Sequence, residues 1–317
     1  MQLASERITK LELERAYSRI RTHVAETALI HSDFLSNRWN ADVFIKCEQF
    51  QPIGAFKIRG ASNFALQLSK EDRAKGLITH SSGNHAQAVA YMANKLGCPA
   101  YVVMPSNSNQ LKIANTKKWG AELTFCEPTI EDRLIQCERI AKEKGGAVCP
   151  PFDHSWIIEG QATTAMEIIR EDKQMDMIIA PLGGGGLLSG SALAAHYFSP
   201  RTVVIGVEPA NAADGYRGLK AGKREVKALA NTVADGLRTT VGVNPFPIIQ
   251  QLVREVWLAQ EKDILPWMYL LWQETKMLIE PSSAVPFAAM DLCADKLKGK
   301  RVAVIITGGN VDLKSLP

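Results

Sequence analysis

The segment 177–195 constrains the fold of this chain most, because it carries no charged side chain over a length close to that of a membrane span. It also holds four consecutive glycines and Pro181, which interrupt a helix. We therefore predict a buried strand, a glycine-rich turn and the first turns of a helix. A strand that is apolar along its whole length has both faces covered, as in a parallel sheet flanked by helices.

Similar apolar, β-branched runs recur along the chain and alternate with stretches of helical period. These runs cover residues 42–48, 100–105, 121–126, 176–181 and 202–208. Such alternation predicts an α/β protein with mainly parallel sheets. Because ligands of these folds bind beyond the carboxyl ends of the strands, we examine the loops that follow strands.

The composition is that of a folded chain without a charged tail. Its 317 residues are 46% hydrophobic and 22% charged, which excludes a disordered or fibrous protein and, at about 150 residues per domain, allows two domains. The net charge of +4 is not concentrated in a run of five like charges, so no nucleic-acid partner is expected. The first residues lack the apolar stretch of a signal peptide, and we expect a cytoplasmic protein with no membrane partner. Six cysteines form no CxxC pair, which argues against a zinc finger.

Lys57 lies between Phe56 and Ile58, just before a helical pattern. A lysine among apolar neighbours either extends its ammonium group to the surface or is desolvated. Desolvation disfavours the charged form, so the second interpretation gives a nucleophile toward an aldehyde and a base for proton transfer.

A loop after a predicted strand gathers Ser81, Ser82, Gly83, Asn84 and His85 ahead of an alanine-rich helix. The side chains are either ordinary helix caps or, with the backbone amides of the helix start, a cradle for a carboxylate.

The glycines Gly183, Gly184, Gly185 and Gly186 follow another strand and precede a helix. Their spacing matches neither a dinucleotide fingerprint nor a P-loop, but converging amides at a helix start suit a phosphate. A last buried strand ends at Thr307, which lies either in a hairpin turn or against a ligand heteroatom.

Together these loops supply an amine, an anion clamp, a phosphate cradle and a hydroxyl, the groups that a pyridoxal phosphate enzyme requires. Over nearly its whole length the chain resembles the fold type II pyridoxal phosphate enzymes, in the group of serine/threonine dehydratases, serine racemases and threo-3-hydroxyaspartate ammonia-lyases. The resemblance is carried by GAFKIRGA, SSGNHAQAVA, the glycine loop, ADGLRT (234–239), KMLIEPS (276–282) and TGGNVDL.

The resemblance implies two doubly wound, mainly parallel sheets. A small domain of residues 76–153 would be inserted in a large domain of residues 1–75 and 154–317, with the cofactor between them. The resemblance also implies a homodimer and a small-molecule amino-acid substrate.

The resemblance further assigns roles to the loop residues. The implied cofactor-binding residues are Phe56, Lys57, Asn84, Gly183, Gly184, Gly185, Gly186, Leu187 and Thr307. The implied substrate-binding residues are Ser81, Ser82, Asn84, His85 and Arg133. Lys57, which would hold the cofactor as an imine, and Ser82 are the expected catalytic residues, because they match the proton carriers on the two cofactor faces in racemases. Thr307 matches the hydroxyl that faces the pyridine nitrogen, where the family usually shows serine.

Two features bear on the subfamily. One is a match to a cation site of racemases and hydroxyaspartate ammonia-lyases, formed here by Glu208, the Ala212 carbonyl and Asp214. Its oxygen ligands suit Mg²⁺, Ca²⁺ or Mn²⁺. Without that match, Glu208 and Asp214 are two carboxylates beside a helix start. Arg133 matches an arginine that reaches the substrate region in racemases, and an arginine is able to clamp a β-carboxylate with two hydrogen bonds. The alternative is a surface helix residue. The turn at 150–154 is closer to that of threonine dehydratases, so the signals conflict.

The expected activity is β-elimination of water from threo-3-hydroxyaspartate, L-serine or L-threonine, giving a 2-oxo acid and ammonia. A hydroxyl facing the pyridine nitrogen does not hold a proton there, which suits a reaction that quickly expels a leaving group. The alternative is a serine or aspartate-type racemase with dehydratase side activity. A β-replacement synthase and a non-catalytic binding protein are further alternatives.

Overall fold

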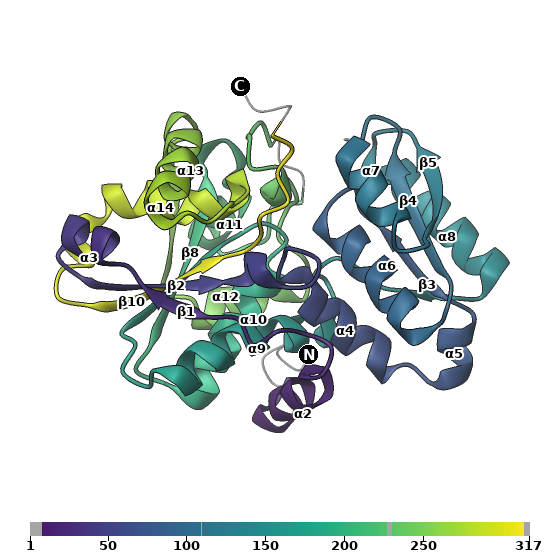
Figure 1. The fold of residues 1–317 in the computed structure, drawn as a ribbon, viewed down its shortest axis with the longest axis horizontal. Helices are drawn as coiled ribbons and strands as arrows, with labels where there is room; N and C mark the ends of the chain where they lie inside the picture. The colour runs from purple at the N-terminus through teal and green to yellow at the C-terminus, as the bar shows by residue number, and fades with distance from the viewer. Residues whose placement is uncertain (1–7, 109, 227–229, 314–317) are drawn as a thin grey trace.

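The computed structural model describes residues 8–108, 110–226 and 230–313, which form two sheets with helices on their faces (Figure 1). The larger sheet has the strand order β1-β2-β10-β7-β8-β9, in which β1 is antiparallel to β2 and the other pairs are parallel. Its strands are β1 (Leu29–His31), β2 (Asp42–Cys47), β7 (Met177–Pro181), β8 (Val203–Pro209), β9 (Glu255–Ala259) and β10 (Arg301–Ile306).

Helices cover both faces of this sheet, so its central strands are apolar along their length. One face packs against α3 (Asp33–Trp39), α13 (Glu261–Thr275) and α14 (Pro281–Leu292). The other packs against α9 (Ser155–Glu171), α10 (Gly186–Phe198) and α12 (Pro245–Leu252), with α2 (Lys10–Ile20) outside them. Every residue of β7 is buried, as the uncharged sequence predicts.

The smaller sheet has the order β5-β4-β3-β6, and its pairs are parallel. Its strands are β3 (Leu77–His80), β4 (Ala100–Pro105), β5 (Glu122–Cys126) and β6 (Ala147–Val148). Helices α6 (Asn84–Leu96) and α7 (Gln110–Lys117) pack on one face and α8 (Ile130–Lys144) on the other. These strands all lie between β2 and β7 in the chain; the domain boundaries at residues 76 and 153 stay a prediction.

Helix α4 (Lys57–Gln67) lies between the two sheets and contacts α9 and α6 (Figure 1). A fully buried ion-pair network holds it there: the Nε atom of Arg59 is 2.7 Å from Glu48, and its Nη1 atom is 2.6 Å from Glu167. The remaining elements are α5 (Lys70–Ala74), α11 (Asp214–Ala221) and the 3-10 turns η1 (Glu48–Phe50), η2 (Ala210–Ala212), η3 (Asp235–Leu237) and η4 (Ala294–Lys296).

The expected fold class is confirmed, and the five strand predictions agree with β2, β4, β5, β7 and β8 to within one residue at each end. The segment 177–195 forms β7, the glycine loop and most of α10, as predicted. Among the described residues, no helix is both long and apolar enough to cross a membrane. β1, β6 and β9 were not predicted from the sequence.

Candidate active site

Lys57 is the first residue of α4, and its side chain is half-buried. Its Nζ atom donates a hydrogen bond of 2.8 Å to the carbonyl oxygen of Pro151. Burial lowers the pKa of Lys57 to about 8, while the charge of the nearby Glu280 carboxyl opposes that change. An amine with this pKa is partly neutral near pH 8, as a nucleophile or base has to be. The structure therefore favours the desolvated lysine over one that extends into solvent.

The loop before Lys57 pairs with the loop after β10. The backbone N–H of Phe56 donates to the carbonyl oxygen of Thr307 at 2.9 Å, and Ala55 forms an antiparallel bridge with Gly308. Thr307 therefore lies beside the segment that carries the lysine, although the two are far apart in the sequence.

Thr307 is buried at the carboxyl end of β10, and its hydroxyl contacts α14. The Oγ1 atom of Thr307 lies 3.0 Å from the Oγ atom of Ser283. The same Ser283 oxygen accepts hydrogen bonds from the backbone N–H groups of Thr307 at 3.1 Å and Gly308 at 3.0 Å. The position of the Thr307 hydroxyl is thus set by a residue of the neighbouring helix.

Asn84, at the start of α6, is held by side chains from two distant parts of the chain. Its Nδ2 atom donates to the two carboxylate oxygens of Glu280 at 2.9 and 3.1 Å. Its Oδ1 atom accepts a hydrogen bond of 2.9 Å from Asn310. Burial raises the pKa of Glu280, which is 6% exposed.

The loop 81–85 lies at the amino end of α6, where backbone N–H groups lack partners within the helix. Ser81 and Ser82 are half-buried, and His85 is buried. The Nε2 atom of His85 lies 3.0 Å from the carbonyl oxygen of Cys149, so it donates there. Burial, together with the nearby Lys57, lowers the pKa of His85 to about 3. His85 is therefore neutral, and its buried Nδ1 atom has no partner among the described residues.

The glycine loop joins β7 to α10 and has no room for side chains. A Cβ atom on Gly184 would lie 2.2 Å from the ring of Phe152, and Gly185 has a φ of +90°, which L side chains rarely adopt. The loop ends at Gly186, where α10 begins, and Leu187 is buried in the first turn of that helix. Close-packed backbone at a helix amino end fits the phosphate of pyridoxal 5'-phosphate.

The predicted cation ligands lie close together in the chain, at the end of β8, in η2 and at the start of α11. Glu208 is fully buried, and its two oxygens accept from the N–H groups of Gly215 at 2.9 Å and Tyr216 at 2.8 Å. Burial and the nearby Asp214 carboxyl raise the pKa of Glu208 to about 8, and burial also raises the pKa of Asp214. The Ala212 residue in η2 is buried as well. Two adjacent buried carboxylates and a carbonyl are a donor set that fits a hard divalent cation.

Arg133 lies in the first turn of α8 and is half-buried. Burial lowers the pKa of His80, the residue before Ser81, and the charge of Arg133 lowers it further, so the guanidinium lies near the 81–85 loop. Among the described residues its buried Nε atom has no hydrogen-bond partner.

The sequence analysis assigned no role to several residues of this site: Pro151, Phe152, Glu280, Ser283 and Asn310. Glu280 and Asn310 lie within motifs that carry the resemblance. The motifs indicated that these residues matter, but not which side chains they contact. Their contacts join segments about 200 residues apart, as the 196-residue separation of Asn84 and Glu280 illustrates.

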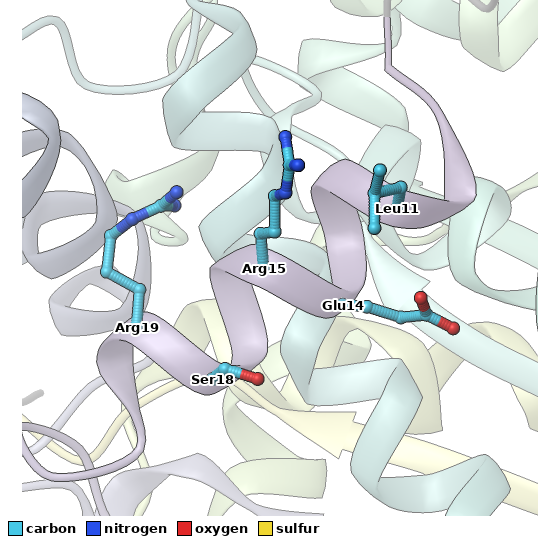
Figure 2. Close-up of a pocket in the computed structure, with 5 residues that line it drawn as sticks. All are labelled: Leu11, Glu14, Arg15, Ser18 and Arg19. Carbon is cyan, nitrogen blue, oxygen red and sulfur yellow. The ribbon is translucent and has the colours of Figure 1, made fainter.

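A hollow of about 490 Å³ lies elsewhere, along the outer side of α2. Figure 2 shows the side chains that line it: Leu11, Glu14, Arg15, Ser18 and Arg19. No predicted site residue lines this hollow, and it is open to the surface, so it is not the candidate active site.

Lys57 is a desolvated amine at the start of α4, between the two sheets, and the glycine loop and the buried Thr307 hydroxyl are further groups that a pyridoxal phosphate enzyme requires. Comparison with known proteins agrees. A family model described as "Pyridoxal-phosphate dependent enzyme" matches residues 20–308, and the chain belongs to this family.

Curated relatives match along almost the whole chain. The β-hydroxyaspartate dehydratase of Paracoccus denitrificans is 40% identical over 302 residues, which cover 95% of this chain and 96% of the relative. The L-threo-3-hydroxyaspartate ammonia-lyase of Saccharomyces cerevisiae is 41% identical over 300 residues, 94% of this chain and 92% of the relative. The solved structure of maize serine racemase superposes with a TM-score of 0.93 at 36% identity, covering 96% of this chain and 94% of that one.

Proposed function

We propose that this enzyme eliminates water from a β-hydroxy amino acid, giving a 2-oxo acid and ammonia, with threo-3-hydroxyaspartate as the first candidate and L-serine and L-threonine as the others. The observation that carries the proposal is Lys57, an amine with a pKa lowered to about 8 and fixed between the two sheets. The bound cofactor supplies an electron sink that makes the α-proton of an amino acid acidic.

Lys57 has two tasks in this proposal. It holds the cofactor covalently through its Nζ atom, and it takes the α-proton once the substrate amine has displaced it. The carbonyl oxygen of Pro151, at 2.8 Å, orients the Nζ atom. The β-hydroxyl of the substrate then leaves as water, with a proton from the cofactor phosphate or a nearby acid, and hydrolysis of the unsaturated product gives the 2-oxo acid and ammonia.

The loop 81–85 is proposed to hold the substrate α-carboxylate with hydroxyls and the amides at the start of α6. His85 contributes a neutral imidazole there, since its pKa is lowered to about 3. Asn84 is proposed to face the phenolic oxygen of the cofactor, with Glu280 and Asn310 fixing the orientation of its amide.

The cofactor itself is proposed to lie with its phosphate on the loop 183–186 and Leu187, its ring beside Phe56 and its pyridine nitrogen against Thr307. The support is the absence of room for a Cβ atom at Gly184 and the pairing of the Phe56 and Thr307 loops.

We propose that Mg²⁺, or Ca²⁺ or Mn²⁺ in its place, binds Glu208, Asp214 and the Ala212 carbonyl oxygen. The support is the pair of buried carboxylates, whose negative charges repel each other unless a cation lies between them. The cation takes no part in the bond-breaking step; it would hold the loop between β8 and α11.

We propose that the substrate carries a second carboxylate on its β-carbon and that Arg133 binds it. Its guanidinium lies near the loop 81–85 and could clamp a second carboxylate with two parallel hydrogen bonds. Two relatives at 40% and 41% identity are named as hydroxyaspartate enzymes, which supports the same assignment.

The test is release of ammonia and 2-oxo acid from L- and D-serine, L-threonine and both threo-3-hydroxyaspartates. We expect the largest kcat/KM with one hydroxyaspartate isomer. Arg133→Met should lower that value at least about tenfold, because it removes a charge-assisted pair, and should change the value for L-serine less. Equal losses for both substrates would contradict the clamp, and no release from any of them would contradict the elimination.

Racemisation is the second candidate, because Ser82 matches the proton carrier of racemases on the cofactor face opposite the lysine and the chain is similar in structure to a serine racemase. A base on each face of the substrate would exchange the α-proton without elimination. Exchange of the α-proton with deuterated water, without 2-oxo acid, would favour this reaction. Ser82→Ala should abolish exchange into the opposite enantiomer and leave elimination by Lys57 measurable.

For the assembly we propose a homodimer, by the same resemblance, and for the location we propose the cytoplasm. Light scattering of the purified holoenzyme should give twice the mass of the chain, and fractionated cells should show it in the cytoplasm. A monomer mass at micromolar concentration would contradict the dimer.

A further inference from the structure

We propose that Asp153 is a positioning residue for the cofactor phosphate, because it holds the loop 241–244 against the glycine loop 183–186. Asp153 does not touch the cofactor in this proposal; it acts through the backbone N–H of Gly242. The inference rests on the proposed function, in which the phosphate lies on the glycine loop.

Asp153 fixes the loop 241–244 with three hydrogen bonds. Its Oδ2 atom accepts from the N–H of Val243, and its Oδ1 atom accepts from the N–H of Asn244, both at 2.8 Å. The Oδ1 atom also accepts from the side-chain amide of Asn244 at 2.8 Å. Hydrogen bonds to an ionised carboxylate are about twice as strong as those between neutral groups, so one side chain determines where this loop lies.

The N–H of Gly242 carries this constraint to the glycine loop. It donates to the carbonyl oxygen of Gly184 at 3.1 Å. Its neighbour Val241 is fixed as well, because the N–H of Val241 donates to Asp214 at 2.8 Å. The C=O and N–H groups of a planar trans peptide point in opposite directions. The bond from Gly242 to the Gly184 carbonyl therefore turns the N–H of Gly185 away from the loop 241–244.

This peptide orientation matters because the glycine loop has N–H groups to offer. Gly183, Gly184 and Gly185 are buried, and their N–H groups have no hydrogen-bond partner within residues 8–108, 110–226 and 230–313. A buried N–H without a partner is costly, so these groups fit a bound anion. If the Gly184 carbonyl turned toward the same side, its oxygen would repel that anion.

The residue before Asp153 also contacts the glycine loop. A Cβ atom on Gly184 would lie 2.2 Å from the Phe152 ring, and one on Gly185 would lie 2.8 Å from Pro245 at the start of α12. The glycine loop is thus in contact with Phe152 and with α12, and the Asp153 carboxylate joins these two elements. Removing the carboxylate should release the start of α12 and let the Gly184 peptide rotate.

The test compares the cofactor with the same molecule lacking its phosphate. In Asp153→Ala we expect the Kd of pyridoxal 5'-phosphate to rise about tenfold, the effect of one or two lost hydrogen bonds to the phosphate. The Kd of pyridoxal should stay at the wild-type value. Fluorescence titration of the cofactor-free proteins measures both. Equal losses for the two ligands would overturn the proposal, because a general loss of structure does not depend on the phosphate.

Asp176→Ala is the matched control. Asp176 is also a half-buried aspartate that accepts from a backbone N–H, that of Arg301 at 2.9 Å, but it lies at the opposite end of β7 from the glycine loop. We expect the wild-type Kd for both ligands. Asp153→Asn keeps one acceptor oxygen and should raise the Kd of pyridoxal 5'-phosphate less, about threefold. Wild-type affinity in Asp153→Ala, or an equal rise in Asp176→Ala, would overturn the proposal.

A measurement on the wild type does not depend on any variant folding. Coupling between two sites is reciprocal, so pyridoxal 5'-phosphate should slow amide hydrogen exchange in the segment 241–244 more than pyridoxal does. Equal exchange with the two ligands would overturn the role of the loop. Failure of the proposed function would look different, because the wild type would then form no imine with either ligand.

Discussion

Asn84 and Glu280 join the two sheets of this enzyme through one amide. Asn84 begins α6 on the smaller sheet, Glu280 precedes α14 on the larger one, and the Asn84 Nδ2 atom lies 2.9 and 3.1 Å from the two carboxylate oxygens. The burial that raises the pKa of Glu280 also strengthens this hydrogen bond, since little water competes for it. The pair therefore holds the start of α6 and the start of α14 in one arrangement.

Removing the Glu280 carboxylate should loosen the site. In Glu280→Ala the Asn84 amide loses its acceptor, and we expect the Kd of the cofactor to rise about tenfold, the effect of one charge-assisted hydrogen bond. Glu280→Gln keeps one acceptor oxygen and should show a smaller rise. Equilibrium titration of the cofactor-free proteins by fluorescence measures both, and equal affinity of Glu280→Ala and wild type would contradict the role of this pair.

The lowered pKa of Lys57 predicts a pH dependence of stability in the cofactor-free protein. Because the pKa is about 8 in the folded state and 10.5 in the reference state, the unfolded chain binds more protons between these values, and stability should rise with pH across this window. The free-energy cost of burying the charged lysine is fully present below pH 8. Lys57→Met should therefore be more stable than wild type by about 3 kcal/mol at pH 7 and equally stable above pH 10.5. Denaturant titrations at both pH values test this, and a constant difference would contradict it.

Divalent cations should stabilise the protein through Glu208 and Asp214. We expect saturating Mg²⁺ to raise the melting temperature by about 2 to 4 °C, and Glu208→Gln and Asp214→Asn to abolish the increase. KCl at the same ionic strength is the control for non-specific screening. An increase that survives in both variants would place the cation elsewhere.

The buried network beneath α4 should dominate the electrostatic contribution to stability. Arg59→Met leaves Glu48 and Glu167 buried without their shared partner, which should cost about 3 to 5 kcal/mol. The matched control is Arg38→Met, because Arg38 forms a partly exposed pair with Asp291 that is worth at most about 1 kcal/mol. Urea unfolding of both variants gives the comparison, and similar losses would contradict the account.

The strands and the glycine loop could be predicted from the sequence because their signals are local. Residues 177–181 are apolar at every position, and the glycines that follow leave only a turn before a helix. Lys57 could be singled out for the same reason, since its apolar neighbours are adjacent in the chain. β1 could not be predicted, because a three-residue strand with one half-buried and two exposed residues gives no periodic pattern.

The supporting contacts of the site could not be predicted, because they depend on how the two sheets meet. Nothing near Ser283 in the sequence indicates that its hydroxyl accepts from two amides of the loop after β10. Phe152 gives no local sign that its ring packs on Gly184. Such contacts follow from tertiary packing, which a single sequence specifies only through the whole fold.

The central claim is that Lys57 holds the cofactor. The most direct measurement is reduction of the holoenzyme with borohydride, followed by proteolysis and mass mapping of the peptide that carries the cofactor. We predict the added mass on the peptide that contains Lys57, and no covalent cofactor in Lys57→Ala. Cofactor attached to a different lysine, or covalent cofactor that persists in Lys57→Ala, would contradict the account.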